Sequence, residues 1–117
     1  MTQVCYAADL EAVQDAARRI APYAHRTPVL TSSTLDDLAG RRLFFKCENF
    51  QKAGAFKARG ATNAVFGLSE ADAKQGVATH SSGNHGLCLS YAAGRRGIPA
   101  TVVMPRTAPE AKSRTWS

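Results

Sequence analysis

Two short segments of this sequence contain the side chains that could do chemistry. In the first, Lys57 follows Phe56 and a glycine-containing turn, at the expected start of a helix. The positive end of the helix dipole and the neighbouring Arg59 disfavour an ammonium ion there, which predicts a lowered lysine pKa. A neutral amine is a nucleophile and forms Schiff bases with aldehydes. The alternative is that Lys57 is one of several surface lysines and only solvates the helix.

The second segment is a polar, glycine-containing loop between an expected strand and an expected helix. It contains Ser81, Ser82, Gly83 and Asn84. Backbone N–H groups at a helix N-terminus bind anions, and the hydroxyls and the amide add directional hydrogen bonds. The loop matches neither GxGxxG nor a Walker loop nor a GxSxG elbow. It therefore predicts a small-anion site, such as one for a carboxylate, with a simple helix cap and turn as the alternative.

Two histidines flank this loop. His80 and His85 are not spaced with carboxylates or cysteines as metal ligands would be, so no metal site is expected. We expect His85 to orient the loop and His80 to be a strand histidine with its hydrogen bonds satisfied.

The surrounding elements follow from periodicity and from capping residues. Helices are expected at 9–21, 31–38, 56–66 and 87–96, and Gly40 and Gly97 follow two of them. Strands are expected at 43–47, which reads as buried, at 77–80 and at 100–104. The order strand, glycine loop, helix, glycine, strand predicts a parallel βαβ unit and the α/β class. Residues 107–112 look like the opening turn of another helix, so the fold reads as incomplete.

Composition excludes several broad classes. The chain has 117 residues, 44% hydrophobic and 21% charged, which is ordinary globular usage. The net charge of +6 comes from scattered basic residues, which does not favour a nucleic-acid partner. We expect no membrane span and no secretory signal. Three cysteines without a CxxC pair favour a reducing compartment, and we expect a cytoplasmic protein.

The two chemical segments, taken together and in this order, resemble one known family. The chain is similar to the N-terminal part of the fold-type II pyridoxal-phosphate enzymes, the tryptophan synthase β-like group, and specifically to serine racemases and threonine or serine dehydratases. The resemblance covers most of the chain and rests on the matching segments Thr27–Leu30, Lys46–Gln51, Phe56–Ala61, His80–Gly86, Gly97–Ala100, Met104–Pro105 and Thr107–Pro109.

The resemblance implies a role for each matching site residue. Lys57 would hold pyridoxal phosphate covalently and, once released by substrate, move the α-proton on one face. Ser82 would act as acid and base on the opposite face, as in racemase-like members. Phe56 would flank the cofactor ring, and Asn84 would hydrogen-bond its phenolic oxygen. The substrate carboxylate would be held by Ser81, Ser82, Asn84 and His85.

The resemblance also implies effectors, partners and a division into domains. Animal serine racemases bind ATP, and the matching positions here are Ser32, Ser33, Thr34 and Lys52, although Ala53 departs from the threonine common in those enzymes. Ala55 replaces the serine that usually precedes the Phe-Lys pair. Residues 1–76 would begin the large domain and 77–117 the small one. Mg²⁺ and homodimer formation are expected for the full-length family, whose phosphate cup and metal site would lie beyond Ser117.

The implied activity is an ammonia-lyase reaction on serine or threonine, with serine racemisation at the same site. The alternative is a truncated, catalytically inactive fragment of such an enzyme. The resemblance leaves open serine, threonine or hydroxyaspartate as substrate, and elimination or racemisation as the main reaction.

Overall fold

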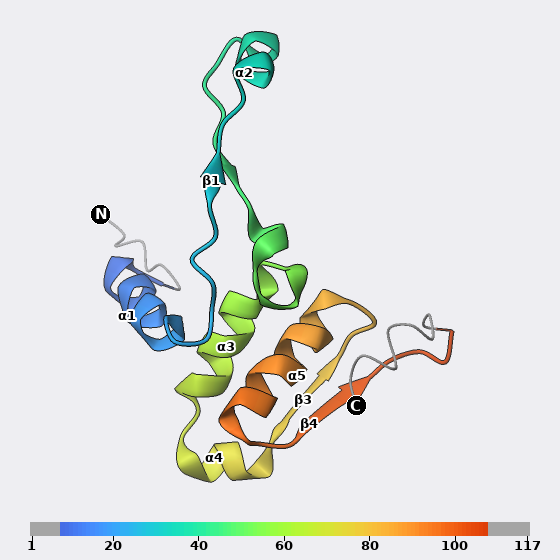
Figure 1. The fold of residues 1–117 in the computed structure, drawn as a ribbon. Coiled ribbons are helices and arrows are strands. Elements are labelled where there is room, and N and C mark those ends of the chain that lie inside the picture. The colour runs from blue at the N-terminus through green and yellow to red at the C-terminus, as the bar shows by residue number, and fades with distance from the viewer. Residues whose placement is uncertain (1–7, 108–117) are drawn as a thin grey trace, which may run out of the picture.

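The computed structural model describes residues 8–107 and has an α/β fold (Figure 1). This confirms the predicted class. The elements, in chain order, are α1 (Leu10–Ile20), β1 (Val29–Leu30), α2 (Ser33–Ala39), β2 (Phe45–Lys46), the 3₁₀ turns η1 (Glu48–Phe50) and η2 (Lys52–Gly54), α3 (Lys57–Gly67), α4 (Glu70–Gln75), β3 (Val77–His80), α5 (Asn84–Arg96) and β4 (Ala100–Val103).

The core lies where α3 packs along α5. Small side chains dominate this contact, and small side chains let two helix backbones approach closely. Around it, Ala53, Phe66, Val77 and Ile98 pack as half-buried side chains. The buried members of the core are Ala55, Ala58, Ala61, Val65, Cys88, Leu89 and Ala92.

The second half of the chain forms the predicted βαβ unit. β3 and β4 pair in parallel, with Val77 opposite Ala100 and His80 opposite Val103. Helix α5 connects them, and the left-handed Gly97 (φ 72°) ends that helix. The helix begins at Asn84, three residues earlier than predicted, since Gly83 rather than a polar side chain occupies the N-cap position. Asn84 and His85 therefore belong to its first turn.

Residues 28–47 form an arm that projects from the helical body (Figure 1). β1 pairs antiparallel with β2, and α2 sits at the tip between the caps Ser32 and Gly40. The prediction of a buried strand at 43–47 was wrong. Phe44 and Phe45 are 63% and 41% exposed, since only the other strand of the arm contacts β2.

Helix α1 confirms its predicted cap, because the Asp9 carboxylate accepts a hydrogen bond from the Ala12 N–H at 2.8 Å. Helix α4, capped by Ser69, was not predicted. The predicted helical turn at 107–112 lies outside the described residues apart from Thr107. Within residues 8–107, none of the helices is long and apolar enough to cross a membrane.

Candidate active site

Lys57 is the first residue of α3, as the sequence predicts, and its side chain is exposed. The chain reaches it through a tight turn in which Ala53 (φ 56°) and Gly54 (φ 63°) both adopt left-handed conformations. Phe56 occupies the N-cap position and is 64% exposed beside the lysine. The ion pairs of residues 8–107 all lie elsewhere, so the ammonium of Lys57 has no carboxylate partner in that part of the chain.

The loop between β3 and α5 is held by the first of its two serines. Ser81 Oγ accepts hydrogen bonds from the N–H groups of Gly83 and Gly86, at 3.2 and 3.1 Å. Ser81 therefore caps the start of α5, as the simpler alternative for this loop anticipated. The side chains of Ser82, Asn84 and His85 are exposed. These three residues keep their polar groups available to a ligand.

The lysine and the loop lie at the same end of the helix pair. At the far end, Arg96 of α5 donates hydrogen bonds to the carbonyl groups of Val65 and Leu68, the latter at 2.9 Å, where α3 ends. Burial raises the pKa of the Cys88 thiol in α5, and the nearby Lys57 ammonium acts in the opposite direction. The helices are therefore parallel, with their positive dipole ends on one side (Figure 1).

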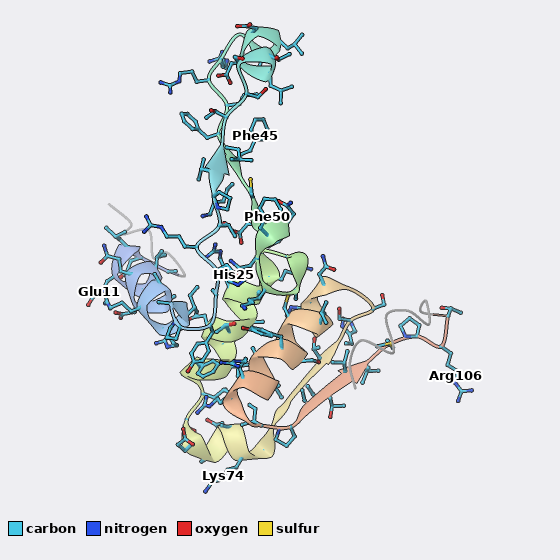
Figure 2. The ribbon with its side chains drawn as sticks, in the orientation of Figure 1. Glu11, His25, Phe45, Phe50, Lys74 and Arg106 are labelled. Carbon is cyan, nitrogen blue, oxygen red and sulfur yellow. The ribbon has the colours of Figure 1, made fainter. Side chains whose placement is uncertain are left out.

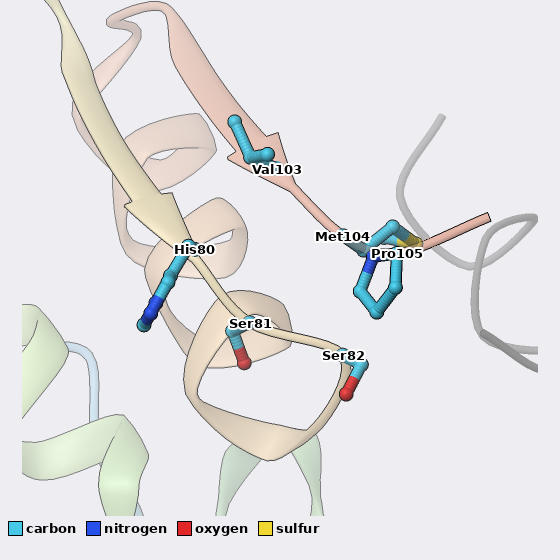
Figure 3. Close-up of a pocket in the computed structure, with 6 residues that line it drawn as sticks. All are labelled: His80, Ser81, Ser82, Val103, Met104 and Pro105. Atoms are coloured by element: carbon cyan, nitrogen blue, oxygen red, sulfur yellow. The ribbon is translucent and has the colours of Figure 1, made fainter. Parts of the chain in front are cut away.

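A cavity of about 460 Å³ opens at the carboxyl end of the parallel strand pair (Figure 3). One side of it is formed by His80, Ser81 and Ser82, and the other by Val103, Met104 and Pro105. The prediction for His80 was wrong in one respect. Its side chain is exposed at this cavity, since the last residue of a strand at a sheet end has no covering layer here. The cavity places an imidazole and two hydroxyl groups together.

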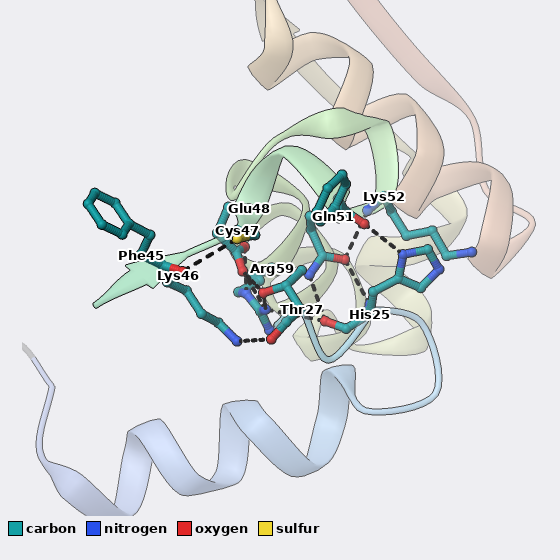
Figure 4. Close-up of polar contacts among 10 residues, drawn as sticks. His25, Thr27, Phe45, Lys46, Cys47, Glu48, Gln51, Lys52 and Arg59 are labelled. Carbon is teal, nitrogen blue, oxygen red and sulfur yellow. Dashed lines mark hydrogen bonds and ion pairs between the residues drawn. The ribbon is translucent and has the colours of Figure 1, made fainter. Parts of the chain in front are cut away.

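Sequence reasoning missed a polar network that fixes the turn before Lys57 (Figure 4). The Glu48 carboxylate accepts hydrogen bonds from Arg59 Nε and Nη2, at 2.8 and 2.7 Å, and from Thr27 Oγ1 at 2.5 Å. The Gln51 amide bonds both the N–H and the carbonyl of His25 at 2.8 Å. The available signal was a carboxylate and an amide in the segment just before the lysine.

This network corrects the part assigned to Arg59. The sequence predicts that its charge acts on Lys57, but the guanidinium is bound to Glu48, so its charge is compensated there. Arg59, chiefly through its hydrogen bonds, lowers the pKa of Glu48 from 4.5 to about 2. In return, Glu48 raises the pKa of Arg59. The pair holds the first turn of α3 against the 25–28 segment.

The four residues matched to an ATP site lie in two separate places within one chain (Figure 1). Ser32, Ser33 and Thr34 lie at the start of α2, at the tip of the arm, and Ser32 Oγ accepts from the Leu35 N–H at 3.4 Å. Lys52 lies in η2, which packs beside α5. The described residues also contain no cluster of three or more His, Cys, Asp or Glu side chains that could hold a metal ion.

These features define a class: α/β proteins in which an exposed lysine amine and an anion-binding loop share one end of a parallel helix pair. Within that class, residues 20–115 match the family model described as pyridoxal-phosphate dependent enzyme, and the chain belongs to this family. The exposed amine, free of a carboxylate partner in the described part of the chain, fits the aldehyde of that cofactor.

Relatives and solved structures agree with this family. The chain is 68% identical over 100 residues to the beta-hydroxyaspartate dehydratase of Paracoccus denitrificans, covering 86% of this chain and 32% of that protein. It is 57% identical over 107 residues to a serine racemase of Oryza sativa subsp. indica, covering 92% and 32%.

The fold superposes on maize serine racemase with a TM-score of 0.91 and 54% identity, covering 95% of this chain and 34% of that one. The corresponding values for the threonine deaminase of T.th. are 0.82, 46%, 92% and 34%. The fold-type II prediction is therefore confirmed. The chain spans about a third of the length of the relatives it matches.

Proposed function

We propose that this chain is the N-terminal part of an ammonia-lyase that acts on β-hydroxy amino acids, with serine racemisation as a second reaction of the same site. The supporting observation is the exposed Lys57 amine at the same end of the helix pair as the Ser81–Gly86 loop. Serine or threonine would lose water and ammonia to give a 2-oxo acid. Hydroxyaspartate joins this substrate set because a relative 68% identical is a beta-hydroxyaspartate dehydratase.

In this proposal two side chains move protons. Lys57 binds the cofactor aldehyde through its amine and, when substrate displaces it, takes or returns the α-proton on one face. The exposed hydroxyl of Ser82 does the same on the other face, which racemisation requires. Pyridoxal phosphate, when bound, supplies the electron sink that makes the α-proton acidic.

The remaining roles are binding and orientation. The substrate carboxylate meets Ser81, Ser82, Asn84 and His85 at the positive end of α5, where helix N–H groups favour an anion. The bonds from Gly83 and Gly86 fix the Ser81 oxygen, so Ser81 would mainly set the shape of the loop. Phe56 flanks the cofactor ring, and Asn84 hydrogen-bonds its phenolic oxygen.

We extend the proposal to assembly and effectors. A homodimer would let Ser32–Thr34 of one copy approach Lys52 of another, which a single chain does not do. ATP would bind in that groove, and Mg²⁺ would act as a further effector of the whole enzyme. Residues 1–76 and 77–117 would belong to the large and the small domain, and the protein would be cytoplasmic.

Borohydride reduction tests the role of Lys57. The 117-residue chain is incubated with pyridoxal phosphate, reduced and digested, and the modified peptide is found by mass spectrometry. We expect the pyridoxyl group on Lys57, no labelled peptide in Lys57→Ala, and unchanged labelling in Lys52→Ala, a control at a nearby lysine. Equal labelling of both lysines would contradict the proposal.

Turnover distinguishes the two readings of the chain. The loaded chain is given serine, threonine or hydroxyaspartate, and 2-oxo acid and ammonia are measured. The second candidate, a fragment that is catalytically inactive, is favoured by the coverage of only about a third of the relatives. Specific labelling of Lys57 without turnover would select that candidate, whereas labelling with turnover would exclude it.

A further inference from the structure

A second cavity, of about 330 Å³, lies outside the candidate active site, between α1 and the polar network around Arg59. Its two walls differ in chemistry. The apolar wall is formed by Ala17, Ile20, Ala21 and Ala24. The basic wall is formed by His25, Arg26, Lys46 and Arg59. Figure 4 shows Lys46 reaching from β2 toward Thr27 beside α1, and Figure 2 shows where His25 stands between α1 and the arm.

The basic wall has more positive charge than nearby carboxylates compensate. Arg26, Lys46 and Arg59 are cations at neutral pH, and Glu48 is the carboxylate bound to this group, through Arg59. The other two ion pairs of residues 8–107 are Arg18–Asp15 and Arg96–Glu70, which involve none of the wall residues. Two of the three cations therefore lack a carboxylate partner in the described part of the chain.

The wall also retains hydrogen-bond donors. Lys46 Nζ donates to the Thr27 carbonyl at 2.7 Å, and an ammonium has two further N–H groups. Arg59 uses Nε and Nη2, and Nη1 makes no hydrogen bond to the described residues. The Arg26 side chain is exposed at the cavity. A ligand that binds here must therefore accept hydrogen bonds and carry negative charge.

We propose that this cavity is an auxiliary site for a small aliphatic carboxylate. The carboxylate group meets Lys46 and Arg26, and the alkyl chain lies against Ile20 and the three alanines of α1. The volume is at the lower end of the range for ligand cavities, about 300–1,000 Å³, which suits a ligand with few carbon atoms. Inorganic phosphate would satisfy the charge but leave the apolar wall uncovered. This site is independent of the proposed lyase function.

The test is a titration of the ¹⁵N-labelled 117-residue chain with butyrate, followed by backbone amide shifts at constant ionic strength set with chloride. We expect saturable shifts in residues 20–27, and none with butylammonium, which has the same chain and the opposite charge. Arg26→Gln and Lys46→Met should each raise the dissociation constant by about tenfold. Arg95→Gln, which removes an equal charge from an exposed position on α5, should leave it unchanged.

Three outcomes would overturn the proposal. Shifts confined to residues 81–86 would assign butyrate to the loop instead. Equal weakening by Arg95→Gln would reduce the effect to net charge. Phosphate binding as tightly as butyrate would remove the role of the apolar wall. Circular dichroism of each variant separates lost binding from lost folding, and Arg26→Gln, at an exposed side chain, gives the decisive result if Lys46→Met unfolds.

Discussion

Replacing Glu48 with glutamine removes the carboxylate at the centre of the polar network before Lys57. Arg59 donates two hydrogen bonds to it, at 2.8 and 2.7 Å, and Thr27 donates a third at 2.5 Å. These contacts, those from Arg59 first, lower the pKa of Glu48 from 4.5 to about 2 against the opposing effect of burial. The carboxylate is thus stabilised by folding, and the variant should unfold more easily at neutral pH.

The size of the effect follows from this pKa difference. Each pKa unit corresponds to about 1.4 kcal/mol, so the shift corresponds to at most about 3.4 kcal/mol. The Glu48 side chain is 18% exposed and Arg59 33% exposed, so solvent screening reduces the expected loss to about 1–3 kcal/mol. Because the folded-state pKa is the lower one, this contribution is complete above about pH 5 and is lost as the pH falls from about 4.5 to 2.

The assay is urea unfolding followed by circular dichroism at a series of pH values from 7 to 2.5. Glu48→Gln should lower the free energy of unfolding by about 1–3 kcal/mol at pH 7, and the difference from the parent chain should shrink toward pH 2.5. The matched control is Glu70→Gln, which breaks a 2.9 Å ion pair with Arg96 at a carboxylate that is 89% exposed. Its cost should stay below about 1 kcal/mol. Equal losses in both variants, or a Glu48 difference that persists at pH 2.5, would refute the reasoning.

Three further substitutions test the packing that positions the site, each by thermal or urea unfolding. Gly76→Ala should cost more than about 2 kcal/mol, since φ is +80° and a Cβ would lie 2.6 Å from the Pro99 carbonyl oxygen, whereas Gly67→Ala, with open space around it, should cost almost nothing; similar losses would contradict this. Thr62→Val should raise the free energy of unfolding by about 1 kcal/mol, because the Thr62 hydroxyl is buried without a hydrogen-bond partner among the described residues, and a loss of stability would disprove it. Arg96→Met should cost about 2 kcal/mol, because the 12% exposed guanidinium binds the carbonyl groups that end α3, and an unchanged midpoint would show those bonds to be dispensable.

The sequence predicted the features that depend on neighbouring residues. Asp9 caps α1 and Gly40 ends α2, because a cap needs only a side chain or a left-handed residue within one turn. The parallel unit of β3 and β4 was also predictable, from a loop and a helix between two β-branched runs. The start of α5 was predicted three residues late, because Gly83 offers no capping side chain to read.

Features that depend on distant residues could not be predicted in this way. The run around Phe44 and Phe45 reads as a buried strand, but burial depends on what covers it, and the arm projects from the body. The pairing of Glu48 with Arg59 was missed because the two residues are 11 positions apart and meet only when the turn before α3 forms. Thr27, 32 positions before Arg59, joins them from another segment.

The position of the candidate site follows from the smallness of its core. Ala58, Ala61 and Ala92 are almost fully buried where α3 meets α5, so the two helices are held side by side by methyl groups. Because the helices run parallel, this close packing also brings their N-terminal ends together, and with them Lys57 and the loop after β3. The dipoles then add at one edge instead of cancelling, as they would in an antiparallel pair. A site for anionic ligands at this edge is therefore a consequence of the same alanines that make the core.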